Sequence, residues 1–139
     1  MQRNEFFLNF YTNVLNTNFS YSATEQACGT WIDGKTIFRT VIESTAPKDS
    51  GDGIILADVS HLAIERIIRL YGNLIDRAGA CRVPFPITYT LHDNTGNPYI
   101  NAAVNPWVDK SNGTLRMNFI NNGGSYSNCK MYIVLEYIK

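Results

Sequence analysis

The stretch KMYIVLEYI, residues 130–138, is the clearest strand in this sequence. It is rich in aromatic and β-branched residues, which are enriched in strands. Before it, residues 114–120 (TLRMNFI) alternate apolar and polar side chains, and this period of two predicts a strand with one buried face. The residues between them, 121–128 (NNGGSYSN), have the Asn and Gly that are typical of turns. This end of the chain is therefore predicted to form two strands joined by a turn.

Strands and turns alternate through most of the preceding chain. Strands are predicted at residues 35–44, 54–59, 83–92 and 99–104, and turns or loops at residues 46–53, 92–98 and 105–113. Pro84 and Pro86 suit an edge strand or the start of a strand. Short strands at roughly ten-residue spacing are typical of antiparallel sandwiches. The predicted fold class is therefore all-β, with a single antiparallel β-sandwich or jelly-roll-like domain over residues 21–139.

Two segments fit this pattern less well. In residues 2–16, aromatic and aliphatic side chains recur near the helical period of 3.6. Residues 1–20 are therefore predicted as a separate N-terminal segment, which could form a short helix and serve as a docking segment or a trimer stem. Residues 62–76 fit both a helical and a strand period, and their local pattern slightly favours a helix, although Gly72 lies in the middle of it.

The composition argues against several kinds of partner. Twelve basic and twelve acidic residues give a formal net charge of zero, so nucleic acid is not an expected partner. No apolar run approaches the roughly 20 residues that span a bilayer, so no membrane insertion is predicted. Cys28, Cys81 and Cys129 cannot all pair within one chain, and their spacing matches no zinc or redox motif. We expect reduced thiols, no metal site and no cofactor.

Groups that could carry out a reaction are few and scattered. The two histidines are His61 and His92, and the sequence has no GxSxG nucleophile motif. His92 and Asp93, with Thr95 nearby, are interpreted as part of a polar turn rather than of a catalytic triad. The aspartates fall mostly in separate predicted turns, and no motif indicates the carboxylate pair that a glycosidase needs. We therefore expect a protein that is not an enzyme.

Polarity without charge is the more unusual property of this chain. It has fifteen Asn, eight Tyr and only 17% charged residues, a composition similar to that of adaptable recognition surfaces. Trp107 lies on a predicted loop, where an aromatic flanked by acids and amides is typical of glycan or protein binding. The alternative is that Trp107 folds back and plugs one end of the sandwich. The candidate ligand-binding residues are Trp107, Asp109, Tyr126, Asn94 and Tyr99.

The residues around Trp31 carry a family resemblance. Trp31 precedes Asp33-Gly34, a pair favoured in hairpin turns, so we expect the tryptophan to cover the end of a sheet where the chain reverses. The motif YSxxEQxxGxWxDGK, residues 21–35, resembles the start of a module at the C-terminal end of phage and prophage tail-fibre-like proteins. Here Thr36 and Phe38 stand where that family usually has Pro and Tyr.

Later parts of the chain are more loosely similar to the same family. They are His61, the Ile-rich segment up to Gly72, the VPFP of residues 83–86 and the closing YIVLEYIK of residues 132–139. The resemblance thus spans roughly residues 21–139. It implies that residues 64–76 are extended, with Gly72 at a bulge or a close approach. It supplies no catalytic residues.

The resemblance also implies a function. It implies a compact β-sandwich, homotrimeric in many relatives, in a virion that is assembled in the cytoplasm of the bacterial host. The expected role is a tail-fibre or receptor-binding type of domain that attaches to a host-surface glycan or protein and contacts other virion proteins. The alternative is a purely architectural virion protein, such as a head fibre, a decoration protein or part of an appendage, which binds only other virion proteins.

Overall fold

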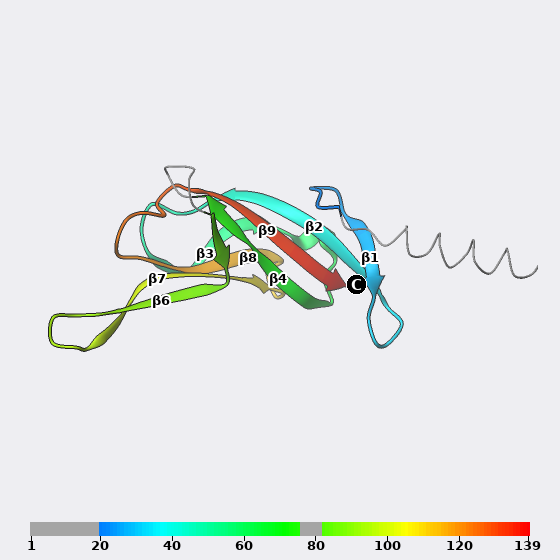
Figure 1. Ribbon diagram of the computed structural model, residues 1–139. Coiled ribbons are helices and arrows are strands. Elements are labelled where there is room, and N and C mark those ends of the chain that lie inside the picture. The colour runs from blue at the N-terminus through cyan, green and yellow to red at the C-terminus, as the bar shows by residue number, and fades with distance from the viewer. Residues whose placement is uncertain (1–19, 76–81) are drawn as a thin grey trace, which may run out of the picture.

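The computed structural model describes residues 20–75 and 82–139, which form two antiparallel β-sheets packed face to face (Figure 1). The five-stranded sheet has the order β1-β2-β9-β4-β5, and the four-stranded sheet has the order β3-β8-β7-β6. In chain order the elements are β1 (Gln26–Thr30), β2 (Thr36–Thr45), β3 (Gly51–Asp58), the 3-10 helix η1 (Ser60–Leu62), β4 (Arg66–Ile75), β5 (Arg82–Phe85), β6 (Ile87–His92), β7 (Pro98–Asp109), β8 (Thr114–Asn121) and β9 (Lys130–Ile138). The prediction of an all-β antiparallel sandwich is confirmed. The helix predicted within residues 2–16 lies outside the described residues, as does Cys81.

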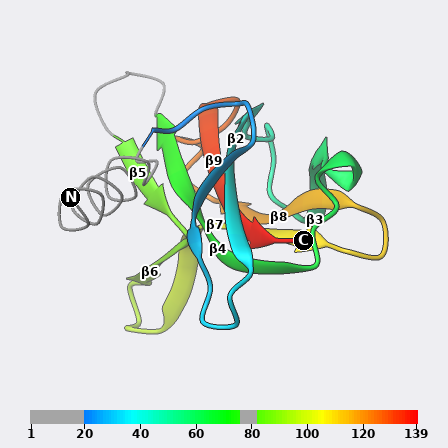
Figure 2. The ribbon, with the colours of Figure 1, turned by 90° about the vertical axis from the view of Figure 1, so that its right-hand side faces the viewer.

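The core lies between β9 and the strands of the facing sheet. β9 occupies the centre of its sheet, between β2 and β4 (Figure 2). Its core-facing side chains have no exposed surface: Met131, Ile133, Leu135 and Tyr137. The facing sheet contributes equally buried side chains: Val104 from β7, and Leu115, Met117 and Phe119 from β8. Burial of a large apolar side chain contributes about 1.5–3 kcal/mol, so this layer is the main source of the sandwich's stability.

Strands from distant parts of the chain pair with each other. β2 pairs with β9, with Phe38 opposite Tyr137, and β3 pairs with β8, with Asp58 opposite Thr114. In the described residues the chain crosses from one sheet to the other four times: between β2 and β3, β3 and β4, β5 and β6, and β8 and β9. Each sheet therefore contains strands from both the early and the late part of the domain.

β4 settles the ambiguity of residues 62–76 in favour of a strand. It pairs antiparallel with β9 along its length, with Leu70 opposite Leu135 and Leu74 opposite Met131. The helix that the local pattern favours is wrong, because pairing with β9 satisfies the backbone and buries alternate side chains, Leu74 completely. Ser60–Leu62, a few residues before this strand, form a short 3-10 helix.

Gly72 in β4 is required by a close approach of its neighbours. It pairs in register with Ile133 on one side and Phe85 on the other. A Cβ atom at this position would lie 2.0 Å from the carbonyl oxygen of Tyr132 and 2.6 Å from Cζ of Phe85. The irregularity of β4 lies elsewhere, before Arg69. Gly72 therefore lies at a close approach of neighbouring strands and not at a bulge.

β7 runs through residues that were predicted as a loop. The loop prediction for residues 105–113 is wrong up to Asp109, because this part of β7 pairs with β8 as far as the pair Asp109 and Thr114. Pro106 is compatible with this strand because β6 pairs with β7 only up to Val104. Beyond that point β7 has a neighbour on one side only, and proline is tolerated in such an edge.

β1 is absent from the strands that the sequence predicts. Its polar residues form an edge strand that pairs with β2 and has a register shift after Ala27. The predicted chain reversal at Asp33-Gly34 is confirmed: Gly34 has a φ of +86°, and its N–H donates to the carbonyl oxygen of Trp31 at 2.9 Å. Trp31 is half-buried at this end of the sheet, and the guanidinium of Arg66 lies 6.0 Å from the centre of its ring.

We expect Gly72→Ala to destabilise the domain by at least about 2 kcal/mol. The added methyl group would overlap the carbonyl oxygen of Tyr132 and the buried ring of Phe85, and relieving both overlaps would require the strands to shift. Gly29→Ala is the matched control. A Cβ atom there has Ile37 Cδ1 at 3.9 Å as its nearest neighbour. Chemical denaturation of the two variants and the parent measures the difference, and equal stability of both variants would contradict the close-approach role.

Candidate binding sites

Trp107 lies on the outer face of the four-stranded sheet. Ile55 of β3, Arg116 of β8 and Trp107 of β7 form a row across three strands, because Arg116 pairs with both neighbours. Trp107 keeps 39% of its surface exposed and Ile55 keeps 59%. The tryptophan is therefore presented from a strand rather than from the predicted loop, and it does not plug the end of the sandwich.

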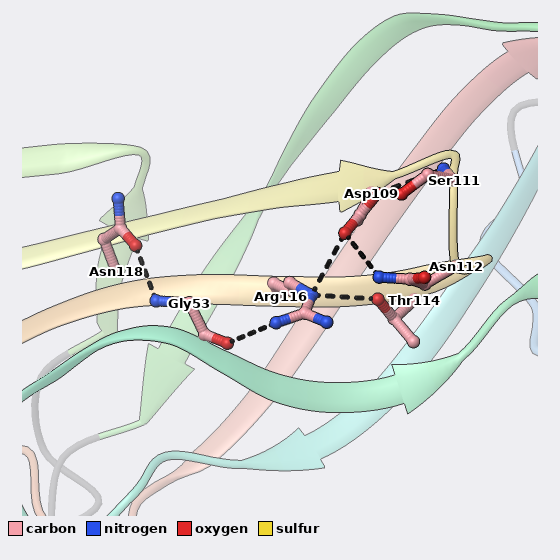
Figure 3. Close-up of polar contacts among 7 residues, drawn as sticks. All are labelled: Gly53, Asp109, Ser111, Asn112, Thr114, Arg116 and Asn118. Carbon is pink, nitrogen blue, oxygen red and sulfur yellow. Dashed lines mark hydrogen bonds and ion pairs between the residues drawn. The ribbon is translucent and has the colours of Figure 1, made fainter.

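Arg116 pairs with this tryptophan across the strands, and polar contacts from neighbouring strands hold its guanidinium (Figure 3). Its Nη1 donates to the carbonyl oxygen of Gly53 at 3.1 Å, and its Nε donates to Thr114 Oγ1 at 3.0 Å. Nε also lies 3.5 Å from Oδ2 of Asp109. The side chain of Asn118 completes the link to β3 by accepting the N–H of Gly53 at 2.8 Å. These contacts hold the guanidinium in one place on the sheet surface.

Asp109 holds the turn that follows β7. Its Oδ1 accepts the N–H of Ser111 at 3.0 Å and the hydroxyl of Ser111 at 2.5 Å, and its Oδ2 accepts Nδ2 of Asn112 at 2.9 Å. The same Asp-x-Ser/Thr arrangement recurs at Asp58 with Ser60 and at Asp93 with Thr95. In all three, the hydroxyl hydrogen bond is the main cause that lowers the pKa of the carboxyl group. These carboxylates stabilise turns.

Asn94 and Tyr99 lie on the hairpin formed by β6 and β7. Asn94 is exposed in the turn at its tip, and Tyr99, the second residue of β7, has 42% of its surface exposed. Tyr89 and Ile100 on the same hairpin are also exposed, at 52% and 42%. The hairpin projects from one end of the sandwich (Figure 1). Its aromatic and aliphatic side chains therefore stand away from the core.

Tyr126 is a half-buried residue of the turn between β8 and β9. It packs against the hydrophobic core. Its N–H donates to Oδ1 of Asn121 at 3.3 Å, and its carbonyl oxygen accepts the N–H of Cys129 at 3.3 Å. Its position is that of a residue closing the end of the sandwich.

The five candidate residues do not converge on one site. Tyr99 and Trp107 are eight positions apart in β7, and at about 3.3 Å per residue their Cα atoms are separated by roughly 26 Å. Asn94 lies near the first of them and Asp109 near the second. The structure instead divides the candidates between the projecting hairpin, the outer face of the four-stranded sheet and the end of the sandwich.

A cavity that the sequence did not reveal lies on the outer face of the five-stranded sheet. It has a volume of about 580 Å³ and is lined by side chains from β2, β9 and β4, with residues 21–23 forming one wall. Two cross-strand rows line it. They are Val41, Val134 and Tyr71, and beside them Glu43, Tyr132 and Asn73. These residues alternate with core residues along their strands, so only the pairing of β2, β9 and β4 brings them together.

A buried charged row closes one end of this cavity. Arg39 and Glu136 are cross-strand partners and their side chains lie 3.6 Å apart, each about one-tenth exposed at 12% and 11%. The hydroxyl of Tyr71 donates to Oε1 of Glu136 at 3.1 Å and lies 3.2 Å from the hydroxyl of Tyr21. The ring of Tyr21 covers the guanidinium of Arg39 at 4.7 Å. Burial, then the bond with Tyr21 and the nearby Glu136 charge, raise the pKa of Tyr71 well above its ordinary value.

The opposite end of the cavity is more open. Nζ of Lys130 lies 2.5 Å from Oε1 of Glu43, and both side chains are about half exposed. The ammonium group also lies 5.4 Å from the centre of the Tyr132 ring. The hydrogen bond from Lys130 to Glu43 is the main cause that raises the pKa of the lysine.

A second, smaller cavity of about 420 Å³ lies between residues 23–25, β2 and the region around His61. In it the carboxylate of Glu25 accepts hydrogen bonds from the hydroxyl of Tyr137 and from Nζ of Lys139, the latter at 2.6 Å. Burial alone would raise the pKa of Glu25, but these two bonds outweigh it and hold the pKa below its ordinary value. Burial and the bond to Glu25 raise the pKa of Tyr137 strongly. The glutamate thus fastens the chain before β1 to the end of β9.

Other kinds of site are not indicated in the described residues. Within residues 20–75 and 82–139, no group of three or more His, Cys, Asp and Glu side chains is placed to hold a metal ion. Cys28 is half-buried and Cys129 is buried, and neither is in a disulfide. In the same part of the chain, no helix has the length and apolar character that a membrane-spanning helix needs.

Comparisons of the chain with protein-family models, with curated proteins and with solved structures gave no match.

The raised pKa values of Tyr71 and Tyr137 predict a loss of stability at alkaline pH. In the unfolded chain both tyrosines ionise near their ordinary pKa of 10.0, whereas in the folded protein they keep their protons to higher pH. Their contribution to stability is therefore complete below about pH 10 and decreases as the pH rises above it. The free energy of unfolding, measured by denaturant titration between about pH 8 and pH 11, should fall over this range.

Tyr71→Phe and Tyr137→Phe should each make that fall shallower, because the group whose ionisation is linked to unfolding is gone. Tyr99→Phe, in which the removed hydroxyl belongs to an exposed ring of the hairpin, is the control and should keep the parent slope. If the Tyr71 and Tyr137 variants both kept the parent slope as well, these two hydroxyls would not be the linked groups.

Proposed function

We propose that this chain is a non-enzymatic attachment domain of a phage virion, which recognises a glycan or a protein on the host surface. The resemblance of residues 21–139 to tail-fibre-like modules supports the setting, and with it a homotrimer that also contacts other virion proteins. The observation that carries the recognition role is the exposure of Trp107 on a rigid sheet face. Weak contacts repeated in linked copies become strong overall, because each bound copy raises the effective concentration of the next.

The environment of Trp107 supports a contact role for several physical reasons. Trp107 keeps 39% of its surface exposed, and tryptophan and arginine dominate the energetics of protein interfaces. Ile55 and Arg116 flank the ring in the same row, which gives a surface with an apolar part and a fixed cation. Because Arg116 is already held by three partners, little side-chain entropy is lost when a ligand packs on it.

We expect Trp107→Ala to reduce binding of the purified protein to host cells at least about tenfold, a loss of roughly 1.4 kcal/mol that is modest for an interfacial tryptophan. Thermal unfolding should change little, because the ring lies on the outside of the sheet. Ile32→Ala is the matched control, since Ile32 is 92% exposed in the turn between β1 and β2. Unreduced binding by the Trp107 variant, with the control behaving as the parent, would remove this face from the proposal.

The hairpin of β6 and β7 favours the second candidate function, an architectural virion protein that binds only other virion proteins. Tyr89, Tyr99 and Ile100 expose apolar surface on an element that projects from the sandwich. Exposed apolar side chains on a projecting element are typical of interfaces between subunits. In this role the hairpin packs against another copy of the chain or another virion protein.

The double variant Tyr89→Ser and Ile100→Ser tests this role. If the hairpin joins copies of the chain, the parent protein should have the mass of an oligomer by light scattering and the variant the mass of a monomer. Ile55→Ser, which removes an equally exposed apolar side chain from the sheet face, should leave the mass of the parent unchanged. A parent that is monomeric at high concentration would contradict self-association through the hairpin.

A further inference from the structure

From the geometry of the cavity on the outer face of the five-stranded sheet, we infer that it is a binding site for a neutral pyranose unit of a glycan. The inference goes beyond the attachment function proposed above, because a sugar can bind here whether or not Trp107 contacts a host. It names a site on the opposite outer face of the sandwich, made by side chains that lie far apart in the sequence. Its volume of about 580 Å³ is within the range of 300–1,000 Å³ of small-ligand sites.

The aromatic walls favour a ligand with C–H faces. Tyr21, Tyr71 and Tyr132 come from three different segments and all line the cavity. The face of an aromatic ring carries partial negative charge, and the C–H groups on one side of a pyranose carry partial positive charge, so the two surfaces attract each other. Val41 and Val134 provide the apolar part of the floor between these rings.

Cations already hold the tyrosine rings in place. The guanidinium of Arg39 lies 4.7 Å from the centre of the Tyr21 ring, and the guanidinium of Arg69 lies 4.1 Å from the centre of the Tyr71 ring. The ammonium group of Lys130 lies 5.4 Å from the centre of the Tyr132 ring. The hydroxyl of Tyr71 is further fixed by Glu136. Rings that are held before binding lose little conformational entropy when a ligand arrives, which benefits the weak contacts that a single sugar makes.

The polar groups of the cavity match hydroxyl groups. Glu43 offers carboxylate oxygens that accept, and Asn73 offers an amide that both donates and accepts. A sugar hydroxyl can do both, so a ring with neighbouring hydroxyl groups can bond to these side chains while its C–H face packs on a tyrosine. A purely apolar ligand would remove water from the same groups without replacing their hydrogen bonds, which is unfavourable.

The charges around the cavity favour a ligand without net charge. Glu43 is paired with Lys130 at 2.5 Å, and Glu136 is paired with Arg39 at 3.6 Å. A phosphate or carboxylate ligand would have to compete with a protein carboxylate for Lys130 and for Arg39, while the third cation beside the cavity, Arg69, lies over the ring of Tyr71 at 4.1 Å. Separating the buried Arg39–Glu136 pair in particular would leave a charge uncompensated. Neutral hydroxyl groups require no such rearrangement.

Titration of the isotope-labelled full chain with methyl glycosides of glucose, galactose, mannose, rhamnose and N-acetylglucosamine tests the inference. At least one neutral glycoside should shift the backbone amide signals of β4 and β9 around Tyr71, Asn73 and Tyr132, with a dissociation constant in the range of about 1 mM. Binding should change little between about 0.05 and 0.5 M salt, because no net charge is recognised. Glucuronic acid should bind no more tightly than glucose.

Two variants of the cavity and one control locate the site. Tyr132→Ala removes a stacking surface and should weaken binding at least about tenfold, and Asn73→Trp should do the same by filling the cavity without removing a core contact. Tyr99→Ala on the hairpin should bind as the parent does. If Tyr132→Ala fails to fold, the Asn73→Trp result decides.

Several outcomes would overturn the inference. One is the absence of shifts with every glycoside, as expected if another part of the chain fills the cavity. A second is that Asn73→Trp binds the glycosides as well as the parent does. A third is that glucuronic acid is the only sugar that binds. Because this readout uses free sugars, its failure leaves the host-cell test of Trp107 unaffected, and failure of the Trp107 test leaves the cavity unaffected.

Discussion

The pairing of β9 with β2 on one side and β4 on the other is the constraint on which the rest of the structure depends. One set of its alternate side chains, from Met131 to Tyr137, is buried against the facing sheet. The other set aligns Val134 with Val41 and Tyr71, and Tyr132 with Glu43 and Asn73. A shift of one residue in this register would turn the core side chains outward and break up the cavity at the same time. Stability and the candidate sugar site thus have a common origin.

The sequence contained most of the fold and little of the candidate sites. Period-two patterns and Gly/Asn turns marked the strands, and Asp-x-Ser/Thr turns such as that of Asp109 are local enough to be found from composition. The errors came from tertiary context. Residues 66–75 suit a helix by their local pattern, and it is pairing with β9 that makes them a strand. Pro106 resembles a loop residue, but it fits in β7 because the pairing of β6 with β7 ends at Val104.

The cavity could not have been found from local sequence. Tyr21, Tyr71 and Tyr132 are separated by long stretches of chain, and each is an ordinary outward-facing residue of its own segment. Their proximity depends on the register of two strand pairs, which no single-sequence pattern specifies. The five candidates chosen from the sequence were instead near turns, where polar and aromatic residues are conspicuous. β7 places Tyr99 and Trp107 toward its two ends, so they lie on different parts of the surface.

The pairing of early with late strands also has a consequence for how the chain folds during synthesis. Phe38 must find Tyr137 before the five-stranded sheet has its central strand, and Asp58 must find Thr114 before β3 joins the other sheet. Contacts between residues so distant in sequence close large loops and make folding slow. While the ribosome is still adding residues 82–129, β2 and β4 have no β9 to separate them, and their apolar faces stay open to other nascent chains. Production of this domain should therefore be limited by aggregation before completion of the chain more than by the stability of the finished sandwich.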